Sequence, residues 1–355
     1  MKTLYNNLMA LCENDDTPFY YSDQSINPGE FYRIFSYHFT DKDSWLLPDA
    51  LEARGIMFEV DRDGNPLRIA SRPMQKFFNK GEVDFIDYGE PKYIMIKADG
   101  SLISSYTLAN GAVKLKSKTS IGSEYAQLAT DLLYADADLL DFVEESEKKG
   151  YTVNMELVSP DPNFRIVVHY PEDRLIILNA RHRETGEYMP FDEIPDNYFT
   201  GFGTYKDLEK VQDQTGIEGY VVIDDKGNWW KEKSKWYLER HRAKDFINQP
   251  MAFVELVLKD EADDVFMLIE DQPTLLKEMQ NLQHKVISKA NHIVNKVSHY
   301  WQENKDLSRK DYAIKGKEEL SSLEFGLAMQ YYSNGEEPNW KESFLRSIKK
   351  INWYD

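Results

Sequence analysis

The sequence predicts an α+β domain, with mainly antiparallel β-sheets flanked by helices, over residues 1–243, and an all-helical domain over residues 244–355. Two observations predict this fold class. Short runs rich in β-branched and aromatic residues, separated by turn residues, fill most of the first two thirds. After Trp236 these runs stop, and apolar residues recur with helical spacing. At 355 residues the chain is long enough for two separate cores.

The strands of the first domain are expected where short apolar runs are bounded by turn residues. These runs are residues 32–39, 55–60, 67–71, 93–96, 102–107, 113–117, 152–158, 166–169, 175–180 and 219–224. Asp63-Gly64 and Asn110-Gly111 lie between successive runs and are typical hairpin turns. Helices are expected over residues 3–13 and 123–149. The first domain should therefore be built mainly from hairpins.

The second domain is expected to consist of amphipathic helices. Its longest apolar stripe is Leu275, Met279, Leu282, Val286, Ile293 and Val297. Residues 320–332 and 340–353 have similar spacing. His284, His292 and His299 lie on the same expected helix, roughly 11 to 12 Å apart along its axis, so they cannot share one metal ion. We expect them to be surface or interdomain residues.

The composition is that of a folded, acidic protein. Hydrophobic residues make up 41% and aromatic residues 13% of the chain, too many for a disordered protein. The net charge of -18 argues against indiscriminate binding to nucleic acid. Residues 226–244 nevertheless hold seven Lys and Arg against two Glu, whereas residues 131–147 hold seven carboxylates and no base. This contrast predicts a basic face on an acidic body.

Cysteine usage and hydropathy predict a cytoplasmic protein. Cys12 is the only cysteine, so an intrachain disulfide is excluded, and its expected role is packing in a reducing compartment. Asn6 and Asn7 interrupt any apolar core of a signal peptide. No apolar run approaches the roughly 18 residues that a membrane span needs.

The stretch of residues 93–101 carries the first candidate for chemistry. An apolar run ends in Lys97, and Asp99-Gly100 supplies turn residues that should reverse the chain into a return strand over residues 102–106. A lysine held at such a fixed corner suits a nucleophile, provided that its pKa is lowered from about 10.4. Taken alone, the motif is more typical of a charged turn at the end of a strand than of a catalytic site.

Further charged residues follow in order along the chain. They are Arg54, Lys76, Lys116-Ser117-Lys118, Glu156, Glu218, Lys231 and Lys233. Glu156 lies inside an apolar run, where a carboxylate is costly to bury without a metal or a cation, although an edge position would also explain it. Lys231 and Lys233 point to one face of a strand and repel each other unless an anion lies between them. Surface strands also carry such pairs.

In this order the charged elements resemble the covalent nucleotidyltransferases, which comprise ATP-dependent DNA and RNA ligases and mRNA capping enzymes. The resemblance rests on Lys97-x-Asp99-Gly100, Glu156, Glu218-Gly219 and Lys231-x-Lys233, which are similar to motifs I, III, IV and V. Residues 32–37, 45–52, 54–59, 69–74, 184–188 and 234–237 narrow it to the phage RNA ligase 1 family, which seals breaks in tRNA. The resemblance covers nearly all of residues 1–243 and is looser beyond, where Arg309-Lys310-x-Tyr312-Ala313 matches best.

The resemblance implies an adenylylation domain, an ATP-dependent RNA ligase activity and a set of site residues. Lys97 would be the nucleophile that carries AMP, and Lys118 and Tyr237 would be needed for ligation. ATP would be contacted by Tyr37, Arg54, Lys76, Glu156, Glu218, Lys231 and Lys233. Glu156, Glu218 and Asp263 would be the positions that interact with Mg²⁺, or with Mn²⁺ in its place.

The resemblance also implies the partners. The substrate would be RNA with 5′-phosphate and 3′-hydroxyl ends, above all broken tRNA, and the helical domain would supply the specificity for tRNA or RNA. The enzyme is expected to be a monomer, to act with an RNA end-healing enzyme, and, if it is encoded by a bacteriophage, to work in the cytoplasm of the infected host.

Two alternatives stay open from the sequence. One is a diverged DNA ligase or capping-type nucleotidyltransferase, although helices stand where those enzymes have an appended OB domain. The other is a non-catalytic RNA-binding module that has kept the fold. The complete set of Lys97, Glu156, Glu218, Lys231 and Lys233 argues against such a module, because it has no need for a nucleophile.

Overall fold

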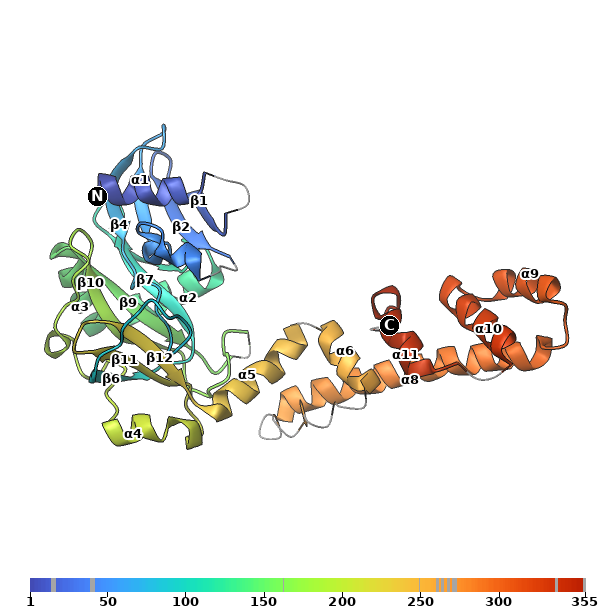
Figure 1. Cartoon of the computed structure of the whole chain (residues 1–355). Coiled ribbons are helices and arrows are strands. Elements are labelled where there is room, and N and C mark those ends of the chain that lie inside the picture. Colours follow the sequence, from blue (N-terminus) through green and yellow to red (C-terminus); the bar gives the residue numbers. More distant parts are fainter. Residues whose placement is uncertain are drawn as a thin grey trace. The chain divides into compact units, whose positions relative to one another are not determined.

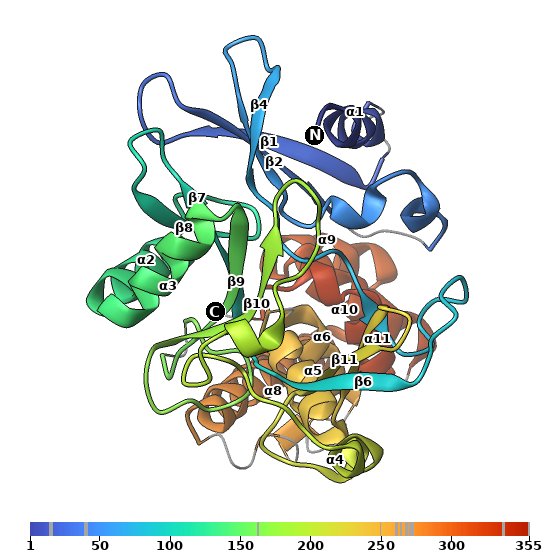
Figure 2. The same ribbon diagram turned by 90° about the vertical axis from the view of Figure 1, so that its left-hand side faces the viewer.

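The computed structural model forms two compact units, Met1–Leu238 and Glu239–Asp355, each of which is described by itself (Figures 1 and 2). The described residues are 1–13, 17–38, 42–161, 163–248, 250–259, 262, 265–266, 269, 273–335 and 338–353. Within its described residues the first unit contains three four-stranded sheets with helices packed on them, and the second is helical throughout its described part. The predicted α+β class with an all-helical end is confirmed.

The first sheet is fully antiparallel and lies at the N-terminal end of the chain. Its strands, in spatial order, are β1 (Phe19–Ser25), β2 (Phe31–Tyr37), β3 (Met57–Val60) and β4 (Pro66–Ser71). Helix α1 (Lys2–Leu11) covers one face and buries Tyr5 against Phe35 and Phe58. The hairpin predicted at Asp63-Gly64 joins β3 to β4. Strand β1 was not predicted, because only its first residue is deeply buried and its sequence has no continuous apolar run.

The second sheet has the order β10-β9-β7-β8 and is also antiparallel. Its strands are β7 (Ser101–Thr107), β8 (Val113–Ser117), β9 (Tyr151–Val158) and β10 (Arg174–His182). Helices α2 (Glu124–Ala135) and α3 (Ala137–Lys148) cover it, and Leu133 and Val143 pack with Met155 in its core. The side chains of Ser123 and Asp136 cap the two helices. The predicted helical segment and the Asn110-Gly111 hairpin are confirmed.

The third sheet contains the strand that ends at Lys97. Its order is β5 (Phe78–Asn79), β12 (Trp229–Lys233), β11 (Gly219–Asp224) and β6 (Pro91–Lys97), and only the β5–β12 pair is parallel. Short helix α4 (Tyr205–Glu209) packs beside it, with Leu208 in the same apolar cluster as Ile94 and Trp230. This sheet places β6 and β12 on either side of β11, so residues more than a hundred positions apart become neighbours.

Two sequence expectations about this region are wrong. Residues 93–106 do not form a hairpin, because β6 pairs with β11 while β7 pairs with β8 and β9, so the chain passes from one sheet to another at Asp99-Gly100. Residues 166–169 do not form a strand. The backbone N–H groups of Val167 and Val168 donate to the carboxylate of Asp99 instead of to a neighbouring strand. Apolar runs alone did not reveal that local partner.

The second unit consists of amphipathic helices around an apolar core. The helices in its described part include α5 (Lys235–Asn248), which begins in the first unit, α6 (Pro250–Lys259), α8 (Pro273–Asn304), α9 (Arg309–Glu319), α10 (Ser322–Asn334) and α11 (Trp340–Arg346). Val286, Ile293 and Val297 of α8 lie in the core with Tyr312 and Trp353. Among the described residues, no helix combines the length and apolarity that crossing a membrane requires.

Candidate active site

Lys97 lies at the end of β6 and is paired in register with Gly219 of β11. This pairing brings Lys97 beside Glu218, and the Nζ of Lys97 donates to Oε2 of Glu218 at 2.7 Å. The other oxygen of Glu218, Oε1, forms an ion pair with the Nζ of Lys233 at 2.9 Å. Gly219 has φ +146°, and a Cβ there would lie 2.0 Å from the carbonyl oxygen of Glu232. Only glycine therefore allows β11 and β12 to approach closely enough to form this charged group.

Asp99 fixes the turn that follows Lys97. Its buried carboxylate accepts hydrogen bonds from the backbone of Val167 and Val168 and from the hydroxyl of Tyr237, each at 2.7 Å. Tyr237 is itself buried, and its ring lies 4.8 Å from the Nζ of Lys233. Because its hydroxyl is already bonded to Asp99, Tyr237 is built to hold the turn and the neighbouring lysine in place.

Glu156 is the second carboxylate of the site. It projects from β9, and its Oε1 accepts a hydrogen bond from the backbone of Gly100 at 3.1 Å. A Cβ on Gly100 would lie 2.1 Å from the carbonyl oxygen of Leu157, so the glycine permits this close crossing between sheets. Burial raises the pKa of Glu156 to about 7, against the lowering effect of Lys97. A further cation near Glu156 would favour its ionised form.

A single pocket gathers most of the predicted site residues. Its charged and phenolic lining is Tyr37, Arg54, Lys76, Lys97, Glu156, Lys231 and Lys233. Its apolar lining includes Met95, Ile96, Leu178, Val221, Phe77 and Trp229, and Asn179 and Thr200 add neutral polar groups. Glu218 reaches the site through its bonds to Lys97 and Lys233, and Lys118 stands beside it with its Nζ 4.2 Å from the ring centre of Tyr37.

Several cations in or beside this pocket have no ion-pair partner among the described residues. Within the described part of the chain, no carboxylate forms an ion pair with Arg54, Lys76, Lys118 or Lys231. Burial, with Arg54 and Lys76 nearby, lowers the pKa of Lys118 to about 8. Burial, with Lys76 and Lys233 nearby, lowers the pKa of Lys231 to about 8. Such a cluster of mutually repelling cations is stabilised by a bound polyanion.

The protonation of Lys97 differs from the sequence expectation. Burial lowers its pKa, but Glu218 and Glu156 raise it more strongly, and the net shift is upward. The sequence indicated that cations surround the lysine, but it did not reveal that Glu218 lies within 2.7 Å. The lysine therefore rests as an ammonium group paired with Glu218.

The sequence analysis named Lys116 without giving it a role, and it missed several residues that line the pocket. Lys116 is fully buried on β8, with its Nζ donating to the carbonyl oxygen of Ser117 at 3.1 Å, and burial lowers its pKa to about 7. Its position two residues before Lys118 on a strand was the available signal. Asn179, Thr200 and Trp229 line the pocket without any sequence signal, since they are common residue types in loops and strands.

The structure offers few carboxylates for a metal ion. No group of three or more His, Cys, Asp and Glu side chains suited to a metal occurs within the described residues, and the predicted metal residue Asp263 lies outside them. Glu156, Glu218 and Asp99 are the carboxylates near Lys97, and Asp99 already accepts hydrogen bonds from Val167, Val168 and Tyr237. This donor set suits Mg²⁺, which keeps most of its water and takes its remaining ligands from substrate phosphates.

The cations around Lys97 make the pocket suited to a phosphate-bearing substrate. Residues 52–244 match the family model described as RNA ligase, and residues 244–352 match the C-terminal domain of T4 RNA ligase 1. The first match covers more than half of the chain, so the chain belongs to the RNA ligase family. The predicted family and the prediction of an RNA ligase are confirmed.

Individual proteins agree with the family match. A protein of Thermovibrio ammonificans named "Putative RNA ligase" is 27% identical over 300 residues, covering 75% of this chain and 77% of that protein. Two forms of an archaeal ATP-dependent RNA ligase are among the solved structures that resemble this chain. Form 2 has a TM-score of 0.48 and 13% sequence identity, and the match covers 82% of this chain and 79% of that protein. Form 1 has a TM-score of 0.44 and 14% sequence identity, and the match covers 93% of this chain and 84% of that protein.

Proposed function

We propose that the protein joins RNA ends in an ATP-dependent reaction, with Lys97 as the residue that carries AMP. The observation that supports this most is the position of Lys97, which is bonded to Glu218 beside a pocket where, among the described residues, Arg54, Lys76 and Lys231 have no carboxylate partner. Excess positive charge fits a polyphosphate, and a lysine at its edge fits attack on phosphorus.

The reaction consists of three displacements at phosphorus. The Nζ of Lys97, after losing a proton, attacks the α-phosphorus of ATP, and the bond to pyrophosphate breaks as the P–N bond forms. An oxygen of the RNA 5′-phosphate then attacks the same phosphorus, the P–N bond breaks, and the lysine regains a proton. Finally the RNA 3′-hydroxyl attacks the 5′-phosphorus and AMP leaves. Such transfers depend mainly on positioning and on neutralising charge.

The site residues divide these tasks. Lys231 and Lys233 hold the α-phosphate, and Arg54 and Lys76, together with Tyr37, hold the rest of the nucleotide. Lys118 adds a cation beside the pocket for the phosphates of the nucleotide and then of the RNA, and Tyr237 acts through Asp99 on the Lys97 turn. Glu156 and Glu218 would hold Mg²⁺ or Mn²⁺, with Asp263 as a further position. The ion would neutralise phosphate charge and draw Glu218 from Lys97.

Incubation with nucleotide labelled in the α-phosphate tests this function. ATP with Mg²⁺ should place acid-stable label on the protein and release pyrophosphate, and added RNA with 5′-phosphate and 3′-hydroxyl ends should then be joined. Labelling by GTP alone would favour a capping-type enzyme, and joining of nicked DNA but not RNA would favour a DNA ligase. Absence of label with either nucleotide would favour a non-catalytic module.

Nucleotide binding should take up protons near pH 8. Lys118 and Lys231 have pKa values lowered to about 8, so each is partly deprotonated there, and a bound triphosphate raises both pKa values again. The affinity should therefore fall as the pH rises through this range. Calorimetry with α,β-methylene ATP, in two buffers of different ionisation enthalpy, measures the uptake. It should decrease in Lys118→Ala and stay unchanged in Lys92→Ala, an exposed lysine on β6. Equal uptake in Lys118→Ala and the wild type would show that Lys118 does not face the phosphates.

The helical domain has a groove suited to RNA phosphates. The helical-unit groove is lined by Lys289, His292 and Lys296 of α8, Arg346 of α11 and Lys350, with other residues of α10. Glu324 is the acidic residue of its lining, and Lys296 neutralises it at 3.0 Å. Within the described residues, Lys289 and Lys350 have no ion pair. This groove supports the role of residues 244–355 in RNA recognition.

A broken tRNA is the RNA that we propose for this groove. The match of residues 244–352 to the C-terminal domain of T4 RNA ligase 1 supports that choice. The protein would act as a monomer, together with an end-healing enzyme that supplies the 5′-phosphate and 3′-hydroxyl ends.

Removing the two unpaired lysines of the helical-unit groove should weaken RNA binding. The double variant Lys289→Ala, Lys350→Ala should bind cleaved tRNA about tenfold less tightly, and the slope of log affinity against log salt should fall by about 1.5. Labelling of Lys97 by ATP, which needs no RNA, reports whether the first unit is intact. The matched control is Lys277→Ala, Lys305→Ala, outside the groove. Equal losses of RNA affinity in both double variants would show that the groove does not take part in RNA recognition.

A further inference from the structure

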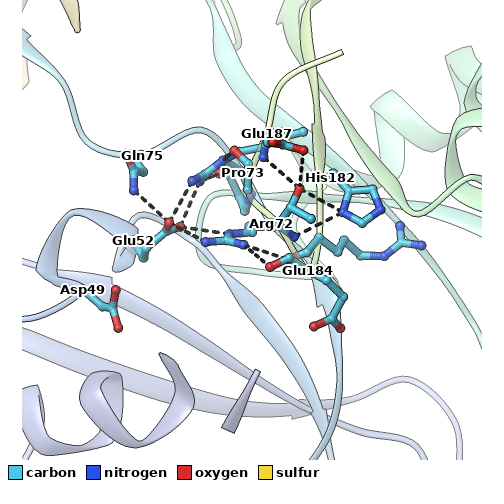
Figure 3. Close-up of polar contacts among 12 residues, drawn as sticks. Asp49, Glu52, Arg72, Pro73, Gln75, His182, Glu184 and Glu187 are labelled. Atoms are coloured by element: carbon cyan, nitrogen blue, oxygen red, sulfur yellow. Dashed lines mark hydrogen bonds and ion pairs between the residues drawn. The ribbon is translucent and has the colours of Figure 1, made fainter. Parts of the chain in front are cut away.

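A buried carboxylate clamped by two arginines lies beside the pocket but outside its lining (Figure 3). Oε1 of Glu52 accepts hydrogen bonds from Nη2 of Arg72, Nη2 of Arg181 and Nε2 of Gln75, each at 2.8 Å. Oε2 accepts from Nη1 of Arg181 at 2.9 Å. The exposed fractions of Glu52, Arg72 and Arg181 are 4%, 8% and 3%. We call these three residues the Glu52 clamp.

The Glu52 clamp joins three segments that are far apart in sequence. Glu52 ends a 3₁₀ turn (Ala50–Glu52) after the first sheet's β2, Arg72 follows β4, and Arg181 lies in β10 of the second sheet. Arg72 also donates to the carbonyl oxygens of Arg183 and Glu184, at 2.9 and 3.1 Å (Figure 3). The clamp therefore ties two sheets together through side chains whose hydrogen bonds have fixed directions.

Each segment of the Glu52 clamp leads directly into the pocket wall. Arg54 is two residues after Glu52, Met74 is two after Arg72, and Asn179 is two before Arg181, and all three line the pocket. Nη1 of Arg181 donates to the carbonyl oxygen of Pro73 at 2.9 Å. Moving any one segment would therefore move a wall residue.

Lys76 and Arg54 are linked to the clamped segments by further bonds. The backbone N–H of Lys76 donates to the carbonyl oxygen of Leu51 at 2.8 Å, and Nη1 of Arg54 reaches the carbonyl oxygen of Met74 at 3.5 Å. No carboxylate among the described residues pairs with either cation. Besides contacts with aromatic rings, their places in the pocket are set by the backbone that carries them, and the Glu52 clamp fixes that backbone.

Stability alone does not explain such a cluster. A buried ion pair gains little over well-packed apolar residues, because both charges must be desolvated. The planar guanidinium groups of Arg72 and Arg181 donate in fixed directions, so they fix the orientation of the segments that they join. An apolar contact or a lysine does not do this.

We infer that Glu52, Arg72 and Arg181 are positioning residues for the nucleotide: they hold Arg54 and Lys76 at the spacing that the triphosphate requires. This inference rests on the proposed function. The clamp residues do not touch the substrate, and they act through the two cations.

The substitution Arg181→Lys tests the inference, because it keeps the charge and loses the fork. The matched control is Arg183→Lys. Arg183 is two residues further along and pairs at 2.6 Å with Glu147, a buried carboxylate that does not line the pocket. In labelling with ATP, Arg181→Lys should raise KM about tenfold and change kcat less than about threefold, since ground-state binding is lost. Arg183→Lys should change neither, while both variants melt at lower temperatures than the wild type.

A coupling experiment separates positioning from a general loss of structure. If Arg181 acts through Lys76, adding Arg181→Lys to Lys76→Ala should raise KM by much less than tenfold, because the two effects share one route. Affinity for ATP measured by calorimetry in a Lys97→Ala background, where no transfer occurs, should follow KM. If Arg181→Lys does not fold, Gln75→Ala provides a second test. It removes the amide that donates to Oε1 of Glu52 and should weaken ATP binding about two- to threefold.

The outcomes distinguish this inference from the proposed function. A wild-type protein that takes no label from ATP overturns the proposed function and the inference with it. A labelled wild type in which Arg181→Lys and Arg183→Lys share the same KM overturns the inference alone. Full additivity of Arg181→Lys and Lys76→Ala would likewise show that the clamp does not act through Lys76.

Discussion

Lys97→Ala is expected to lose all transfer of AMP from ATP to the protein, a decrease of about 10⁴-fold or more, because no other group can form the P–N bond. Lys97 is bonded to Glu218, and none of the neighbouring lysines is placed in that way except Lys233, which pairs with the other oxygen of the same carboxylate. Gel autoradiography with α-labelled ATP measures the loss. The same variant should still join an RNA end that already carries AMP, because that substrate bypasses the lysine.

The control for Lys97→Ala is Lys92→Ala. Both lysines lie on β6, but Lys92 is exposed and does not line the pocket. Lys92→Ala should be labelled at the wild-type rate. Label that persists on Lys97→Ala would mean that another residue carries AMP, and peptide mapping of the labelled protein would identify it.

Lys231→Ala is expected to slow labelling by about 10² to 10³-fold, the loss seen when one group that stabilises transition-state charge is removed. Lys231 and Lys233 alternate on β12 and face the same pocket as Lys97. Burial and neighbouring cations already hold the pKa of Lys231 down to about 8, so its removal should not lower the melting temperature. Single-turnover labelling and thermal unfolding measure the two effects.

Lys226→Ala is the matched control for Lys231→Ala. Lys226 lies in the turn between β11 and β12, where it pairs with Asp87 at 2.6 Å and does not line the pocket. It should leave labelling unchanged. Wild-type labelling by Lys231→Ala would contradict the assignment of the α-phosphate to β12, and a large fall in its melting temperature would show that Lys231 stabilises the fold instead.

The sequence determined much of this protein by local patterns. Helical spacing predicted α2, α3 and the long helix α8, because a helix buries one face whatever it packs against. Turn dipeptides located the hairpins at Asp63-Gly64 and Asn110-Gly111. The order of charged residues predicted the RNA ligase family, which the family match bears out, because that chemistry requires particular residue types at particular strand positions.

Only the tertiary structure decided how these elements meet. Asp99-Gly100 reads as a hairpin turn, but the chain changes sheets there, because the Asp99 carboxylate finds backbone N–H partners near Val168 that are remote in sequence. The pairing of β6 with β11 places Glu218 on Lys97 and reverses the expected direction of the lysine's pKa shift. The Glu52 clamp likewise unites segments more than a hundred residues apart. Local patterns reflect burial and spacing along the chain, whereas electrostatics at a site depends on distances through space, which only the folded chain fixes.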